Sequence, residues 1–277
     1  MTVNFILSFT QIASIQSYKA AIIRLNEIWS APNETEHFLQ GKVYRLDSTD
    51  QTYAIKFNDI SFGYDDNGLI FNNLNLKFEK NKKYLIVGSN GSGKSTLIKI
   101  ISGLCMPDKG TIDFSLGNLQ GLSELRNRIS VVEQDSYLLE DSVINNIFVN
   151  GHSKSEDYID EWYEKSYIRE IIDKLPEGKN TLVSEGGKNL SGGQKRCISI
   201  ARGLVKDSDI LILDEPTANI DSATAEVISK EILRMNKLKN KTMIIISHDE
   251  NLLSIGNDLI KIDMDLLVNR EERQYAG

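Results

Sequence analysis

Cysteine and histidine are scarce in this sequence. Its 277 residues include two cysteines, Cys105 and Cys197, and three histidines, His37, His152 and His248. Two cysteines give no disulfide framework, and neither they nor the scattered histidines have the spacing of a metal site. We therefore expect a reduced chain in which both thiols are small buried apolar side chains.

Long apolar runs and an excess of basic residues are also missing. No stretch reaches the ~20 apolar residues that a membrane-spanning helix needs, and the first residues lack the basic segment and cleavage site of a secretory signal. The net charge of −7 argues against a broad nucleic-acid-binding face, although it leaves a local basic patch open. We expect a soluble globular chain with one large domain or two modest ones.

The first 51 residues are predicted to be a helix and a linker. Apolar residues recur over residues 1–30 at spacings of three and four, which places on one helix face Ile15, Tyr18, Ile22, Leu25 and Trp29. The pattern is as typical of a helix packed on its own domain as of one that belongs to a neighbouring module. Residues 31–51 are polar and irregular, so we interpret them as a linker.

Residues 52–277 are predicted to form one α/β domain. Apolar strand patterns at 54–60, 74–78, 83–87, 129–132, 210–213 and 243–246 are separated by helical stretches. Such alternation predicts a mostly parallel sheet with helices on both faces. Residues 153–176 have a helical pattern without a strand, so we expect an inserted helical lobe at about 135–190.

A glycine-rich loop follows the apolar run at 83–87. It reads Gly88-Ser89-Asn90-Gly91-Ser92-Gly93-Lys94-Ser95-Thr96, which is the spacing of a phosphate-binding loop. Glycines let several backbone N–H groups face one anion, and the helix that begins there adds its positive end. Lys94 offers a charge to the outer phosphates, and the Ser95 hydroxyl is placed to ligate Mg²⁺.

Two carboxylates end the apolar run at 210–213. Asp214 and Glu215 are therefore expected at the carboxyl edge of the sheet, where ligands bind in such folds. Asp214 suits the ligand shell of Mg²⁺, and Glu215 suits the general base that polarises an attacking water. A solvent-facing acidic strand end is the alternative interpretation.

A second anion-binding helix start occurs further along the chain. Leu190 is followed by Ser191, Gly192, Gly193 and Gln194, and then by a helical pattern. Serine is a good N-cap, and the two glycines allow an anion to come close. Because the loop at 88–96 already accounts for a triphosphate, this segment indicates a second nucleotide contact.

These three segments, in this order, closely resemble the ATP-binding cassette (ABC) ATPases over about residues 53–265. The resemblance implies a RecA-like, mostly parallel sheet core with an antiparallel β subdomain and an inserted helical subdomain. It also implies four further roles. Tyr64 would stack on adenine, Gln134 would contact Mg²⁺ and the attacking water, His248 would hold the γ-phosphate, and the loop at 219–221 would cross between paired subunits.

In this family two domains pair head to tail, and each ATP lies between the phosphate loop of one and the Leu190–Gln194 segment of the other. The chain has one set of these motifs, so the resemblance implies pairing with a second ABC domain. Catalysis would then fall to Lys94, Gln134, Glu215 and His248, with ATP and Mg²⁺ as cofactors. Whether the pair is a homodimer or a heterodimer stays open.

Three segments are similar to exporter-type ABC transporters. They are residues 139–147, residues 181–187 and the N-terminal helix. By this similarity Glu185 would contact the membrane domain, and the N-terminal helix looks like the end of a transmembrane helix. They imply an ATPase at the cytoplasmic face of a membrane that powers export, with a transmembrane domain in the same or a partner chain and no nucleic acid. The alternatives are a soluble ABC ATPase of translation or DNA repair, and a module that holds ATP without turnover. The transported substrate is not encoded here.

Overall fold

The computed structural model describes residues 18–19, 21–26, 29–30, 43–46, 48–64, 68–117, 119–149, 154–239, 241–247 and 259–268. It divides the chain into two compact units, residues 1–41 and residues 42–277, and we describe each by itself.

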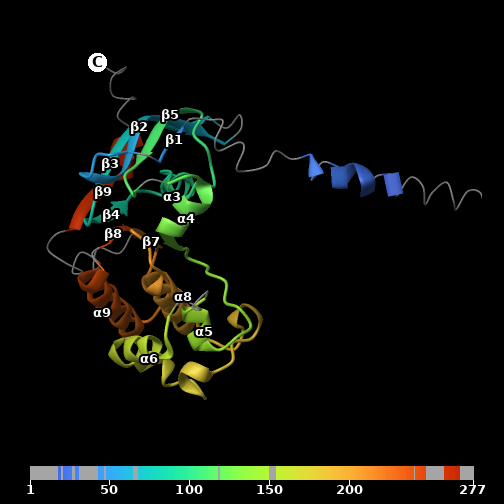
Figure 1. The fold of residues 1–277 in the computed structure, drawn as a ribbon, viewed down its shortest axis with the longest axis vertical. Helices are drawn as coiled ribbons and strands as arrows, with labels where there is room; N and C mark the ends of the chain where they lie inside the picture. Colours follow the sequence, from blue (N-terminus) through green and yellow to red (C-terminus); the bar gives the residue numbers. More distant parts are fainter. Residues whose placement is uncertain are drawn as a thin grey trace, which may run out of the picture. The chain divides into compact units, whose positions relative to one another are not determined.

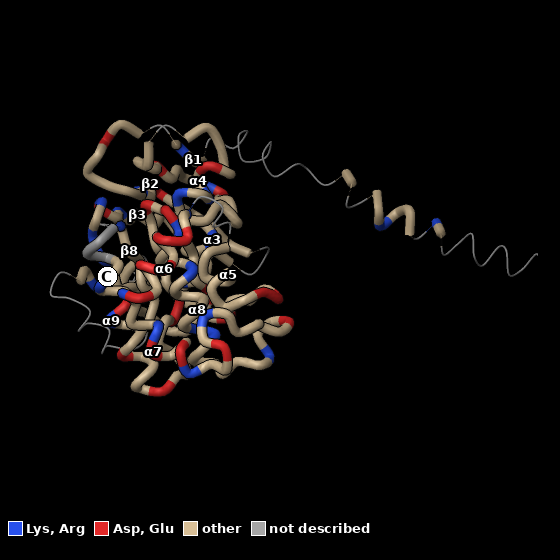
Figure 2. The backbone as a smooth tube through the Cα atoms, turned by 60° about the horizontal axis from the view of Figure 1, so that its bottom comes forward, with Lys and Arg blue, Asp and Glu red and all other residues tan. Residues whose placement is uncertain are grey.

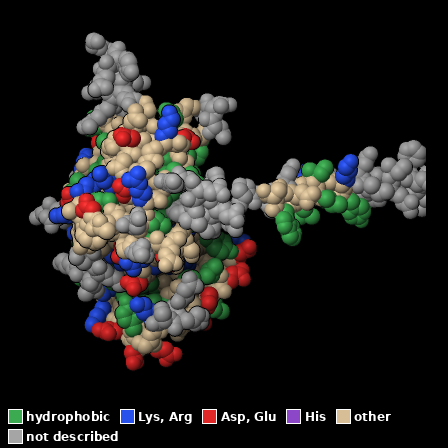
Figure 3. Space-filling view, turned by 45° about the horizontal axis from the view of Figure 1, so that its top comes forward, with side chains coloured by type: hydrophobic (Ala, Val, Ile, Leu, Met, Phe, Trp, Pro, Cys, Tyr) green, Lys and Arg blue, Asp and Glu red, His purple; other side chains and the backbone are tan. Residues whose placement is uncertain are grey.

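The first unit contains a helix with exposed apolar side chains. Its described residues are helical from Tyr18 to Trp29, and the Ser30 backbone N–H closes the last turn on the Asn26 carbonyl at 2.8 Å. Four residues of the expected apolar face, Tyr18, Ile22, Leu25 and Trp29, are more than half exposed, as the green side chains of this segment in Figure 3 illustrate. Ile15 lies outside the described residues. Within the described ranges, no helix is both long and apolar enough to cross a membrane.

A five-stranded parallel sheet forms the centre of the second unit. All neighbouring strands run parallel, in the order β6 (Ile129–Val132), β7 (Ile210–Asp214), β8 (Thr242–Ile246), β4 (Lys83–Val87) and β9 (Leu259–Asp263). The residues of β8 and all but the last of β7 are buried, which is why these strands are apolar without alternation. The predicted parallel core is confirmed.

A four-stranded sheet with antiparallel pairs lies above this core in Figure 1. Its order is β1 (Tyr44–Arg45), β5 (Lys109–Phe114), β2 (Tyr53–Gly63) and β3 (Leu69–Glu79), with β2 antiparallel to both of its neighbours. The sequence patterns did not predict β1, β5 or β9. Strand β1 lies inside the stretch interpreted as a linker. It has two residues and pairs with β5, which is remote in sequence, so no local pattern marks it.

Helices surround the sheet and form a lobe at its far end. The core helices are α3 (Lys94–Ile101), α4 (Leu122–Arg128), α8 (Gly192–Val205), α9 (Ser222–Lys239) and α10 (Met264–Val268). The lobe contains α5 (Val143–Ile147), α6 (Glu156–Lys165), α7 (Arg169–Ile172) and the short 3₁₀ turns Gly178–Asn180 and Glu185–Gly187. Figure 1 shows α5, α6, α8 and α9 at the end remote from the four-stranded sheet.

One apolar core joins the lobe to the parallel sheet. It includes Phe148, Trp162 and Ile198 together with strand residues such as Leu213, all of them buried. Burial raises the pKa of the Cys197 thiol in this core to about 12. The expectation of two buried thiols is right for Cys197 and wrong for Cys105, which is only half-buried and directly follows the exposed Leu104.

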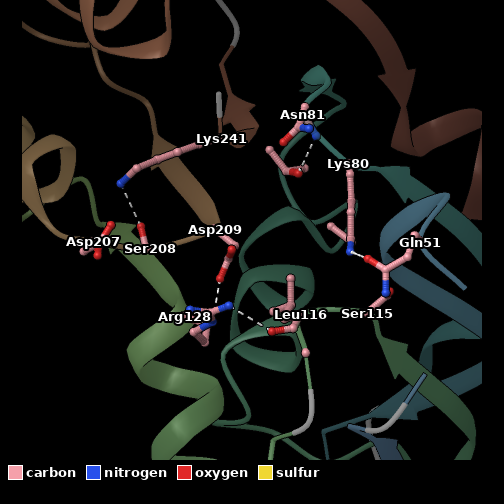
Figure 4. A pocket seen from close by; sticks show the side chains of 13 residues that line it. Gln51, Lys80, Asn81, Ser115, Leu116, Arg128, Asp207, Ser208, Asp209 and Lys241 are labelled. Carbon is pink, nitrogen blue, oxygen red and sulfur yellow. Dashed lines mark hydrogen bonds and ion pairs between the residues drawn. The ribbon is translucent and has the colours of Figure 1, made fainter. Parts of the chain in front are cut away.

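A cavity of about 370 Å³ lies at the amino ends of β7 and β8 (Figure 4). Arg128 Nε lies 2.7 Å from Asp209 Oδ2, and the Lys241 ammonium donates to Ser208 Oγ at 3.0 Å. Both cations are therefore already paired with neighbouring groups. The side chains that line the cavity form a polar network at the amino ends of β7 and β8.

Helix α8 packs so closely on β6 that the position of Gly203 has no room for a side chain. A Cβ atom there would lie 2.3 Å from Val132 Cγ2. We expect Gly203→Ala to lower the free energy of unfolding by about 1–3 kcal/mol. The shift of helix and strand atoms that makes room for the methyl group costs more than the ~1 kcal/mol that alanine gains over glycine in helix propensity. Urea unfolding measures the change. Gly121→Ala is the matched control, since its Cβ meets nothing within 4 Å. Equal stability of the two variants would contradict this packing.

Candidate functional site

The loops that follow β4, β6 and β7 meet at the carboxyl edge of the parallel sheet. They surround a pocket of about 540 Å³. The predicted site residues that line it are Asn90, Gly91, Gly93, Lys94, Ser95, Thr96, Gln134, Asp214 and Glu215. The fold therefore brings the glycine-rich loop, the glutamine and both carboxylates to one place. Gly88, Ser89 and Ser92 belong to the same loop but do not line the pocket.

Glycines shape the loop between β4 and α3. Gly91 and Gly93 have φ angles of 87° and 88°, a region that favours glycine. A Cβ on Gly93 would also lie 2.6 Å from Cε1 of Phe71 in β3. The tight turn points the start of α3 at the pocket, where its free N–H groups and positive dipole suit an anion.

Lys94 places its ammonium on this loop. Its Nζ donates to the backbone carbonyls of Gly88 and Ser89, at 2.8 Å each. The buried Ser92 hydroxyl oxygen has no hydrogen-bond partner among the described residues. A cation, an open helix start and glycine backbone at one concave surface fit the phosphates of a nucleotide.

A carboxylate from the far end of the chain anchors the outer side of the loop. Asp265 in α10 accepts the Ser89 backbone N–H at 2.8 Å and the Ser89 hydroxyl at 2.7 Å. These hydrogen bonds, helped by the charge of Lys94, hold the pKa of Asp265 below its usual value. Asp265 belongs to no motif and its partner is far away in sequence, so no sequence signal could have identified it.

Asp214 and Glu215 have different environments although they are neighbours. Burial and the charge of Glu215 raise the pKa of Asp214, whereas Arg196 and Lys94 oppose the shift. The backbone of Glu215 is left-handed, with φ of 47°, and Ser247 Oγ lies 3.3 Å from its Oε2. A left-handed glutamate costs about 1–3 kcal/mol, so its surroundings must hold it in place.

Tyr64 is not among the residues that line this pocket. It follows β2, its ring packs edge-on against Phe62 with 5.0 Å between centroids, and Lys99 Nζ lies 5.5 Å from its ring centroid. The residue as a whole is 37% exposed. Its stacking on adenine stays a prediction.

The segment 191–194 forms the capped start of α8 and lies elsewhere. Ser191 Oγ accepts the Gln194 N–H at 3.2 Å, and Gln194 Oε1 accepts the Ser191 N–H at 2.8 Å, which caps α8. Ser191 and Gln194 line a separate cavity of about 380 Å³, together with Asp221 and Thr224. One chain therefore does not bring this segment to the phosphate loop.

His248 lies outside the described residues. The preceding residue, Ser247, directly follows β8, and its backbone N–H donates to the Ile86 carbonyl of β4 at 3.3 Å.

Comparison with known proteins defines the class. The family model described as "ABC transporter" matches residues 71–218, and the chain belongs to this family. It is an ATP-binding domain of the kind that hydrolyses ATP.

Individual relatives agree with this assignment. The chain is 32% identical to the lactococcin-G-processing and transport ATP-binding protein LagD of Lactococcus lactis subsp. lactis, over 92% of this chain and 36% of that protein. It is also 32% identical to the ATP-dependent lipid A-core flippase of Escherichia coli K12, over 79% of this chain and 38% of that protein.

A solved structure of a bacterial Atm1-family ABC exporter with ATP bound is similar as well. It matches with a TM-score of 0.67 and 28% identity, over 84% of this chain and 42% of that one. The chain thus spans less than half the length of these relatives.

Proposed function

We propose that this chain is the nucleotide-binding domain that powers export across a membrane as part of an ABC transporter. The export role is supported by the similarity to transport ATP-binding proteins and an exporter structure. The observation that carries the pairing of two domains is the division of the nucleotide-binding parts. The phosphate loop and the two carboxylates line one cavity, whereas Ser191 and Gln194 line another. A second ABC domain, turned head to tail, would complete each site.

Magnesium would accompany ATP in this site. Ser95, Gln134 and Asp214 line the same pocket with a hydroxyl, an amide and a carboxylate, and such oxygen groups suit Mg²⁺. When bound, the ion supplies positive charge that offsets the outer phosphates.

The chain's own residues then divide the work of hydrolysis. Lys94 and the loop N–H groups hold the phosphates, and Tyr64 stacks on adenine. Glu215 accepts a proton as a water oxygen attacks the γ-phosphorus and the bond to the ADP oxygen breaks. Gln134 orients that water, and His248 holds the γ-phosphate.

The membrane part would contact the lobe from the cytoplasmic side. Tyr137 and Leu139, just after Gln134, are 61% and 45% exposed. Glu185 is exposed. Among the described ion pairs it has one, in which its Oε2 lies 3.2 Å from Lys188 Nζ. In Figure 2, Lys and Arg are interspersed with Asp and Glu along the second unit, which suits a protein partner better than nucleic acid.

Glu215→Gln is expected to bind ATP and to dimerise, but to hydrolyse ATP at least ~100-fold more slowly, because an amide cannot accept the proton. Steady-state phosphate release and ATP-dependent sedimentation measure the two effects. The control is Glu140→Gln, which alters an exposed glutamate outside the pocket. Undiminished turnover in Glu215→Gln would remove this residue from the role of base.

Two inactive variants are expected to restore each other's activity. Lys94→Met inactivates both phosphate loops of its homodimer, and Ser191→Arg inactivates both Leu190–Gln194 segments of its homodimer. Neither homodimer therefore has a complete site. An equal mixture contains heterodimers with one intact site, and random pairing predicts about a quarter of the wild-type rate. A mixture of Lys94→Met with the double variant is the control, because no intact site can form. If the first mixture is as inactive as the control, the two chains do not complete each other's sites.

The export role predicts where the protein resides in its natural cells. An antibody against this chain should find it in the membrane fraction, because its transmembrane domain lies either in the same polypeptide or in a bound partner. Alkaline carbonate extraction distinguishes these two arrangements, since it releases only a peripheral chain. Recovery in the soluble fraction alone would contradict export while leaving the ATPase assignment intact.

A further inference from the structure

Arg196, one turn into α8, is buried and donates all of its N–H groups to backbone carbonyls. Its side chain is only 6% exposed. A guanidinium has five N–H donors, and here two of them reach the segment after β6 and three reach the last residue of β7 and the two residues that follow it. The acceptors are the carbonyls of Glu133 at 2.6 Å, Gln134 at 2.8 Å, Glu215 at 2.5 Å, Pro216 at 3.2 Å and Asp214.

This arrangement has no spare donor for a ligand. Burial lowers the pKa of Arg196, and the charge of Asp214 partly offsets that effect. A buried cation is costly unless its hydrogen bonds are satisfied, and here they are satisfied by backbone alone. The guanidinium therefore acts on the conformation of two loops.

The two loops are those that carry the proposed catalytic side chains. The Glu215 carbonyl accepts from Arg196 at a residue whose φ is 47°, so the hydrogen bond stabilises a peptide orientation that a glutamate does not adopt by itself. The same guanidinium holds the Gln134 carbonyl. One planar group thus sets the position of both backbones.

We propose that Arg196 is a positioning residue for ATP hydrolysis, which holds the left-handed backbone of Glu215 and the backbone of Gln134 in their working arrangement. The proposal rests on the roles given to Glu215 and Gln134 above. It assigns Arg196 an effect on the rate of the chemical step and little effect on nucleotide affinity.

The same helix offers a matched control. Arg202 donates to the Asn146 carbonyl at 2.7 Å, the Tyr137 carbonyl at 2.8 Å and Asn146 Oδ1 at 2.8 Å. Burial also lowers its pKa. It fastens α8 to the lobe but does not bond to the segment after β7 in any described contact. A loss of kcat that comes only from weaker anchoring of α8 should therefore occur whether Arg196 or Arg202 is substituted.

The experiment is a double-mutant cycle on the full chain. Arg196→Lys keeps the charge but cannot reach five carbonyls. We expect its kcat to fall about 10–100-fold while its Kd for ATP stays within about threefold. In the Glu215→Gln background, measured under single-turnover conditions, it should slow hydrolysis by a smaller factor than in the wild-type background, because its effect through Glu215 is already lost and only its effect through Gln134 remains. Arg202→Lys should leave kcat within about twofold in either background.

Two results would overturn the proposal. One is a fold-loss in hydrolysis rate from Arg196→Lys that is the same in the wild-type and Glu215→Gln backgrounds. The other is an equal loss of kcat in Arg196→Lys and Arg202→Lys. If Arg196→Lys does not fold, Arg196→Gln, which buries no charge, is taken through the same cycle. Wild-type turnover in Glu215→Gln alone would instead refute the assigned base, so the two failures are distinguishable.

Discussion

Parallel pairing of β4, β6, β7 and β8 is the constraint on which the rest of this molecule depends. It puts the carboxyl ends of four strands on one edge, so the residues that follow them meet although they are far apart in the chain. The phosphate loop, Gln134 and the Asp214–Glu215 pair occupy this edge. The opposite edge is occupied by internal pairs such as Arg128 with Asp209, which leaves one end of the sheet for nucleotide.

Helix α8 connects this edge to a second surface. The capped start of α8 lines a separate cavity, and one turn later Arg196 donates to the Glu215 carbonyl. The part of the chain that would touch a neighbour's nucleotide is therefore rigidly attached to the part that would polarise water. This link gives a physical reason why pairing of two domains and hydrolysis should be coupled, since a displacement of the helix start moves both.

The sequence predicted the strands that are buried on both faces, because short apolar runs rich in β-branched residues and bounded by turn residues favour buried strands. It also predicted most of the residues that line the pocket, though not Ile70 or Ala218, because the glycine spacing and the paired carboxylates are dictated by the chemistry of phosphate. The short strand β1 and the strands β5 and β9 were not predicted, because their pairing partners are distant. Asp265 and Arg196 were missed for a related reason. Arg196 bonds to backbone carbonyls, which any residue supplies, and Asp265 bonds to the backbone N–H and hydroxyl of a serine that is far away in sequence, so no local pattern marks either residue.

On the proposed arrangement, one chain holds half of each nucleotide site. The sharpest measurement is the ATPase rate per chain as a function of chain concentration, with the mass of the particle followed by sedimentation at saturating Mg-ATP. We expect a rate per chain that rises in proportion to the dimer fraction and levels off once all chains are paired. A rate per chain that stays constant where sedimentation shows only monomers would rule out shared sites.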